Sequence, residues 1–428
     1  MKLFFKNTHL DTFFSTKEYP FFYSTYYAQS FSFKKESIKN KIKNLSFCSF
    51  SEIENFLSTN KKNSSFHHHL LKQQLTILQN QIHQTSLPNI TLPFFAPKAL
   101  KALQLYQKAQ YNIYQTDFKS ASENLSLALK TFKSQKHFFE CGLCYLSLAQ
   151  IYKICGCFDI AHTMLCQAQK IFTDHIFCPS LIVEIKGYLG LNELYYENYD
   201  NALAYLKEAL TTAQKYNFST QQANIQNWIA LTHLLTKNLD LCLSSIPTSS
   251  SSLPLPTKLF KYEILSHAYK QKQNLPLSLK YINKALPIAK LLNNEKELFE
   301  LTFSKAEVYY QASKLNKAKT IATNLLKNKY STSLSLYKAN AYNLLGLIAI
   351  KENDLKRAKN LFKLSLDLEN SKSRNKGIAI DYNNLAFIAQ KQGNQEETNY
   401  YQKLALQSAK ETNDEELISF LTQQISSN

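Results

Sequence analysis

The feature that most constrains the fold of this chain is a helical hairpin that recurs along the sequence. Its clearest copy is residues 340–366, where apolar residues spaced three and four apart predict two amphipathic helices. Asn353 and Asp354 supply the turn and an N-cap between them, and Gly346 and Ala358 leave room for the two backbones to approach closely. One such hairpin cannot bury its apolar face alone, so it requires neighbours of the same kind.

Related hairpins follow one another at intervals of about 40 residues, with one short step of 36 between Cys242 and Ser278. The small residue predicted to lie at the helix–helix contact of each second helix marks the series. It recurs as Ala121, Ala161, Ala202, Cys242, Ser278, Ala318, Ala358 and Thr398. A repeat of this length predicts an array in which each unit packs mainly on its neighbours.

The pattern resembles the tetratricopeptide repeat (TPR) family, which carries Leu-Gly/Ala in the first helix and Ala-x3-aromatic/Leu-x2-Ala in the second. The resemblance covers roughly residues 99–410. The usual TPR period is about 34 residues, so these repeats are of the long variety, similar to those of kinesin light chains. The resemblance implies an all-α, right-handed solenoid of about eight helical hairpins, preceded by an N-terminal helical extension.

Proline, serine and aromatic residues predict where this array begins and where it is interrupted. The N-terminal segment is crowded with aromatic residues, which either pack on the array or insert into a partner. A proline-rich linker then precedes the repeats, and three prolines with a serine run interrupt the fourth. The predicted parts are an aromatic segment (1–34), a helical extension with its linker (35–97), repeats one to four (98–246), a Ser/Pro loop (247–257), repeats five to eight (258–410) and a C-terminal capping helix (411–428).

The formal net charge of +18 raises the question of nucleic-acid binding. Only Arg357 and Arg374 are arginines, and lysine lacks the planar fork that reads guanine edges or stacks on bases. We therefore interpret the lysines as a solvated surface that favours an acidic protein partner over nucleic acid. No apolar run approaches the roughly 20 residues that span a bilayer, so we expect an intracellular protein of the cytoplasm or the nucleus.

Catalytic and metal-binding patterns are weak in this sequence. Cys141-x-x-Cys144 followed by Cys155-x-Cys157 resembles a metal site, but Cys144 and Cys155 would lie about 16 Å apart along one helix. The run His67–His69 points its side chains in divergent directions. The seven glycines form no phosphate-binding loop. We expect no cofactor, no metal, no small-molecule substrate and no enzymatic activity.

The first helices of the hairpins carry the residues predicted to contact a partner. In TPR proteins these helices present residues beside the packing positions to a bound segment. The predicted contacts are Asn227, Trp228, Lys270, Tyr310, Asn343, Lys351, Asn383, Asn384 and Lys391. The run Asn383-Asn384-Leu385-Ala386 resembles the Asn-Asn-Leu-Ala of kinesin light-chain repeats, which implies asparagines hydrogen-bonding a peptide backbone. The alternative is that they are exposed asparagines in an asparagine-rich chain.

The function expected from these observations is a non-enzymatic protein–protein interaction scaffold, a TPR subunit of a multiprotein assembly. Two alternatives stay open. One is a subunit resembling the TPR subunit of the anaphase-promoting complex, a scaffold of a cell-cycle ubiquitin ligase. The other is a TPR adaptor that senses a peptide or cargo. A basic nucleic-acid binder is less favoured than either, because it rests on charge alone.

Overall fold

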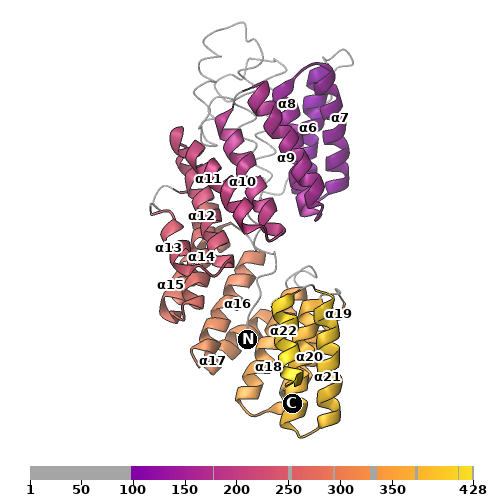
Figure 1. Cartoon of the computed structure of the whole chain (residues 1–428), viewed down its shortest axis with the longest axis vertical. Helices are drawn as coiled ribbons and strands as arrows, with labels where there is room; N and C mark the ends of the chain where they lie inside the picture. Colours follow the sequence, from indigo (N-terminus) through magenta and orange to yellow (C-terminus); the bar gives the residue numbers. More distant parts are fainter. Residues whose placement is uncertain are drawn as a thin grey trace. The chain divides into compact units, whose positions relative to one another are not determined.

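A computed structural model describes residues 98–176, 178–248, 253–292, 295–327, 335–371, 375–412 and 414–426 (Figure 1). The aromatic segment and the helical extension predicted for residues 1–97 lie outside this part of the chain. Within it the regular structure is entirely α-helical, which confirms the predicted fold class. The helices are α6 (Lys98–Tyr114), α7 (Phe118–Ser134), α8 (Phe138–Ile154), α9 (Phe158–Asp174), α10 (Pro179–Tyr195), α11 (Tyr199–Lys215), α12 (Ser219–Leu235), α13 (Leu239–Ser245), α14 (Leu255–Gln271), α15 (Leu275–Leu291), α16 (Glu295–Gln311), α17 (Leu315–Lys327), α18 (Ser335–Lys351), α19 (Leu355–Asn370), α20 (Asn375–Lys391), α21 (Gln395–Lys410) and α22 (Glu415–Ser426).

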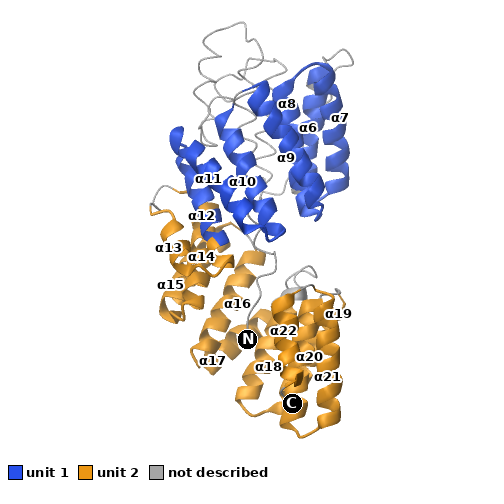
Figure 2. Ribbon diagram, in the orientation of Figure 1, with its two compact units in different colours: residues 1–232 blue, residues 233–428 orange. Residues whose placement is uncertain are grey.

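The chain divides into two compact units, residues 1–232 and residues 233–428, with the boundary inside α12 (Figure 2). In the first unit α6 packs on α7, α8 on α9 and α10 on α11. In the second unit α14 packs on α15, α16 on α17, α18 on α19 and α20 on α21. No helix of the described residues is long and apolar enough to cross a membrane.

The packing register predicted from the repeat is confirmed by burial. All eight small residues of the second helices are at most 1% exposed: Ala121, Ala161, Ala202, Cys242, Ser278, Ala318, Ala358 and Thr398. The close approach predicted at Gly346 is also present, because a Cβ placed there would lie 2.7 Å from the ring of Phe362. A larger residue at either kind of position would push two helices apart.

Each hairpin turns through one residue in the left-handed region, with φ between 57° and 77°. These residues are Thr116, Gly156, Glu197, Lys237, Gln273, Ser313, Asn353 and Gly393. In the hairpin of α18 and α19, the backbone N–H of Asn353 donates to the carbonyl of Ile350. The backbone N–H of Asp354 donates to the carbonyl of Ala349, and these two bonds end the first helix. Asp354 then caps the second helix by accepting the N–H of Arg357 at 3.0 Å, as the sequence predicts.

Two helices depart from the regular pattern. The second helix of the fourth hairpin, α13, has only 7 residues, because the chain becomes extended at Ile246 and reaches Pro247. This short helix lies where the three prolines and the serine run predict an interruption, although α14 already begins at Leu255, inside the predicted loop 247–257. At the other end of the second unit, α22 packs on α21 through Leu417 and Leu421.

Candidate functional site: a polar face of the first helices

The first helix of each hairpin, which we call helix A, has 17 residues in each of α6, α8, α10, α12, α14, α16, α18 and α20. Equivalent positions can therefore be compared directly. Every predicted contact residue falls at position 9, 10, 16 or 17 of its helix. Positions seven apart lie on the same side of a helix, so these four positions form one face. We call this the polar face and describe it within each unit.

Asn343 and Asp381 join two neighbouring helices A of the second unit. The side-chain N–H of Asn343 in α18 donates to Oδ1 of Asp381 in α20 at 2.6 Å. Asp381 is only 1% exposed. Burial raises its pKa to about 7, although the hydrogen bond from Asn343 favours the ionised form. One donor of Asn343 is therefore used inside the chain.

Asn384, one helical turn beyond Asp381, has hydrogen-bonding capacity left over. Its Nδ2 is buried and has no partner among the described residues, and the same holds for Oδ2 of Asp381. A buried donor or acceptor without a partner costs about 1–3 kcal/mol. One donor and one acceptor lie on the same turn of α20, and a peptide group offers the complementary pair. The neighbouring Asn383 is half-buried.

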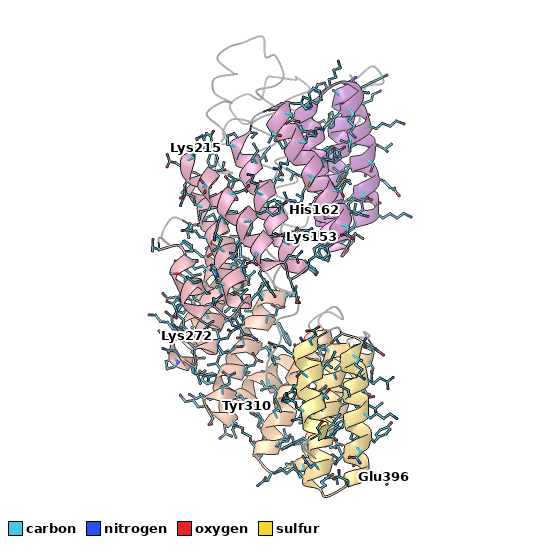
Figure 3. The ribbon with its side chains drawn as sticks, viewed as in Figure 1. Lys153, His162, Lys215, Lys272, Tyr310 and Glu396 are labelled. Atoms are coloured by element: carbon cyan, nitrogen blue, oxygen red, sulfur yellow. The ribbon has the colours of Figure 1, made fainter. Side chains whose placement is uncertain are left out.

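Contacts between lysines and aromatic rings lie beside the residues Asn343, Asp381 and Asn384 on the polar face. Nζ of Lys351, at the end of α18, lies 4.8 Å from the ring centroid of Tyr310 in α16. Nζ of Lys391 lies 5.6 Å from the ring of Phe387. Tyr310, labelled in Figure 3, is half-buried, and burial raises its pKa. Both lysines are exposed and give this part of the face a positive edge.

Three of the predicted contact residues are committed to packing inside their own unit. In the first unit, Asn227 is 0% exposed and Trp228 is 7% exposed. The Trp228 ring lies 6.1 Å from that of Tyr188 in α10. In the second unit, Lys270 of α14 forms a buried ion pair with Glu307 of α16, with 3.0 Å between Nζ and Oε2.

The structure also brings together residues that the sequence analysis missed. Glu263, at position 9 of α14, is 3% exposed and faces Glu297 and Glu300 of α16. Burial is the main reason why its pKa is held well above the usual range, and the charge of Glu297 adds to the effect. Position 9 is asparagine in α18 and α20, whereas α14 has a glutamate there. That difference in the sequence could have marked Glu263 as a residue of the same face.

The cysteines of the predicted metal-site pattern differ in burial within the first unit. Cys144 is buried within α8, and burial raises its pKa well above the ordinary value. Cys155 and Cys157 are exposed just beyond that helix. Among the residues that the structure describes, no group of three or more Cys, His, Asp or Glu side chains is arranged to hold a metal ion.

Comparisons with known proteins find similarity in structure alone. No protein-family model matches the sequence, and no curated protein matches it. The structure is similar to the apo form of the quorum sensor NprR from B. thuringiensis, with a TM-score of 0.59 and 15% identity over 84% of this chain and 97% of that one. The chain has the fold of a TPR α-solenoid.

Two further solved structures are similar at lower TM-scores. A TPR protein from Parabacteroides merdae has a TM-score of 0.43 and 15% identity, covering 65% of this chain and 98% of its own. A Rap protein complexed with Competence and Sporulation Factor has a TM-score of 0.42 and 16% identity, covering 87% and 93% respectively. The helical-hairpin architecture and the similarity to NprR confirm the solenoid fold predicted from the repeat.

Proposed function

We propose that this TPR protein is a non-enzymatic interaction protein whose second unit binds an extended segment of a protein or peptide on its polar face. The observation that carries the proposal is the unused donor of Asn384 beside the unused acceptor of Asp381. An extended peptide offers both a C=O and an N–H at each residue, so it can satisfy the two groups together. Asn343 and Asn383 lie at position 9 of adjacent helices A and extend the same face.

Between a scaffold subunit and a peptide-sensing adaptor, we favour the adaptor. The fold is similar to that of NprR, which is described as a quorum sensor. The unused donor of Asn384 and the unused acceptor of Asp381 suit a ligand that binds reversibly better than a permanent subunit interface, whose core is more apolar. The net charge of +18, with Lys351 and Lys391 exposed, supports a partner with acidic character near that edge.

We also propose that the protein acts in the cytoplasm. The cysteines of the described residues are free thiols, as expected of a reducing compartment. A nuclear location is compatible with the same chemistry.

The proposal is tested by selecting random octapeptides on the full chain and titrating a selected peptide against variants. Asn383→Ala combined with Asn384→Ala removes two side-chain amides and is expected to weaken binding about 5- to 150-fold, at about 0.5–1.5 kcal/mol for each hydrogen bond. Asn399→Ala, an exposed asparagine on α21, is the matched control and should bind as the wild type does. Equal affinities for all three proteins, or no selected peptide, would overturn the proposal.

A further inference from the structure

The turn between α8 and α9 of the first unit carries two exposed thiols that the proposed function leaves unused. Cys155 is the C-cap of α8 and Cys157 is the N-cap of α9, with Gly156 between them. Both cysteines are exposed free thiols. A Cβ placed at Gly156 would meet nothing within 4 Å, so the turn is open to a reagent from solvent. Figure 3 labels Lys153 and His162, which flank this turn in the sequence.

The backbone of the turn holds the two cysteines close together. Gly156 adopts a φ of 77°, and its backbone N–H donates to the carbonyl of Lys153 at 3.0 Å. This bend keeps the Cα atoms of Cys155 and Cys157 closer than the ~7 Å of an extended chain, inside the range that a disulfide bridges. Sγ of Cys157 lies 3.9 Å from the backbone oxygen of Cys155, so its side chain folds back toward the other cysteine.

The other hairpins show that cysteine is an unusual residue at this position. The N-cap of the second helix is aspartate or asparagine in six of the eight hairpins: Asp117, Asn198, Asn238, Asn274, Asp354 and Asn394. In four of them the side chain accepts an N–H of its own helix, and such a cap contributes about 1 kcal/mol to stability. Cys157 makes no such bond. A repeat position that loses its cap and gains an exposed thiol beside a second thiol is typical of a functional site.

The remaining cysteines of the described residues are less suited to thiol chemistry. Burial raises the pKa of Cys141 to about 11 and that of Cys144 well above its ordinary value, so both stay protonated at neutral pH. Cys166 is exposed on α9, but partial burial raises its pKa. Within the described part of the chain, Cys155 and Cys157 alone combine exposure with a second thiol two positions away.

We propose that Cys155 and Cys157 form a dithiol site that a low-molecular-weight disulfide oxidises reversibly. One cysteine, as its thiolate, attacks a sulfur of the small disulfide, whose S–S bond breaks as a mixed disulfide forms and one small thiol leaves. The other cysteine then attacks the mixed disulfide, closes the Cys155–Cys157 bond and releases the second small thiol. The protein loses two electrons and two protons, which the two released thiols carry. Exposed thiols beside a resolving cysteine are typical of redox-sensing sites in reducing compartments.

The test measures how oxidation of the pair depends on a small thiol and its disulfide. The full chain is equilibrated with reduced and oxidised glutathione, alkylated and digested. Cutting after Lys153 and before Asp159 isolates residues 154–158, which contain these two cysteines and no other. Raising both forms of glutathione about tenfold at a fixed ratio should lower the ratio of bridged to reduced pair about tenfold, because bridging releases two thiols for each disulfide consumed. Cys155→Ser and Cys157→Ser each keep one thiol of the pair, so their mixed disulfides should not respond.

Cys166→Ser is the matched control, because it removes an exposed thiol of α9 and should leave the pair unchanged. The bridged peptide takes up no alkylating reagent and is lighter than the dithiol peptide by two hydrogens. A peptide that carries glutathione but is never bridged would overturn the proposal, as would a pair that stays reduced in oxidised glutathione alone. A thermal melt checks that the variants are folded, and if one is not, the concentration dependence of the wild type decides alone. The peptide site proposed for the second unit uses neither cysteine, so it stands or falls separately.

Discussion

At the scale of single residues, the polar face of the second unit contains buried carboxyl groups whose ionised form is destabilised by burial. Asp381 is buried with one oxygen bonded to Asn343 and the other without a partner among the described residues. Glu263 is buried beside two further carboxyls. Groups of this kind lower the stability of the folded chain in their ionised form. Asp381 lies on the turn of α20 that the proposed peptide would contact, where a ligand donor would compensate its unpartnered oxygen.

Asp381 gives a pH-dependent prediction. Its folded pKa of about 7 lies above the ordinary 3.8, so between these values the folded chain binds more protons than the unfolded chain. The unfolding free energy therefore falls as pH rises through this window, by up to about 4 kcal/mol for this group. Above about pH 7 the contribution of Asp381 no longer changes with pH. Asp381→Asn removes the titration and keeps the acceptor for Asn343.

Chemical denaturation of wild type and Asp381→Asn at pH 4.5 and pH 8 provides the measurement. The variant should gain stability relative to the wild type on going from the lower to the higher pH. Asp240→Asn, at an exposed carboxylate paired with Lys272, is the control and should show no such gain. A difference between variant and wild type that does not change with pH would contradict the burial of a titrating Asp381.

At the scale of elements, the hairpins depend on a left-handed turn residue that is glycine in only two copies. Gly156 and Gly393 adopt this conformation without steric cost, whereas Thr116, at φ 61°, is β-branched and exposed. The left-handed region costs a residue with a Cβ about 1–2 kcal/mol. The turn is therefore imposed by the packing of the two helices that it joins, against the preference of its own residue.

Replacing the turn residue should reveal this strain. Thr116→Gly is expected to stabilise the first unit by roughly 0.5–1 kcal/mol, after subtracting the entropy that glycine loses on folding. Gly393→Ala is the inverse change, at a position where a Cβ would meet nothing within 4 Å, and should destabilise the second unit by a similar amount. Calorimetric melting of both variants measures the two shifts. Destabilisation by Thr116→Gly would show that the threonine side chain contributes more than its backbone strain removes.

At the scale of the whole molecule, the chain forms two compact units, and the hairpins inside each unit pack on their neighbours in the sequence. A defect in such an array is expected to remain local, because stability is a sum of repeats and their interfaces. Ala358 is 0% exposed and belongs to a hydrophobic core formed by α18, α19 and α20 of the second unit.

Ala358→Asp should therefore unfold the second unit while the first stays folded. A charge forced into this contact costs about 3 kcal/mol or more, because the core around Ala358 consists of hydrophobic side chains. Limited proteolysis with mass spectrometry should yield a resistant fragment from residues 98–232 and cleavage within residues 335–412. Asn360→Asp places the same charge on the exposed side of α19 and should leave both units resistant. Protection of the second unit in Ala358→Asp would show that the assigned register is wrong.

The sequence by itself determined the hairpins, their order and their packing register. Those properties are local: a small residue must recur where two helices touch, and apolar spacing sets which side of each helix is buried. Local residue preferences likewise predict the interruption at α13 and the cap at Asp354. Helical periodicity also places the predicted contact residues on one face, but it does not determine which of them are accessible.

Only the tertiary structure decided the state of those side chains. Asn343 and Asp381 are 38 residues apart in the chain, and Lys270 and Glu307 are 37 apart, so each pair joins neighbouring hairpins. Whether a polar residue of helix A is paired, buried or exposed depends on what the next hairpin places opposite it. Periodicity fixes the position of a side chain but carries no information about that partner. The burial of Asn227, Trp228 and Glu263 therefore depends on the helices packed beside them.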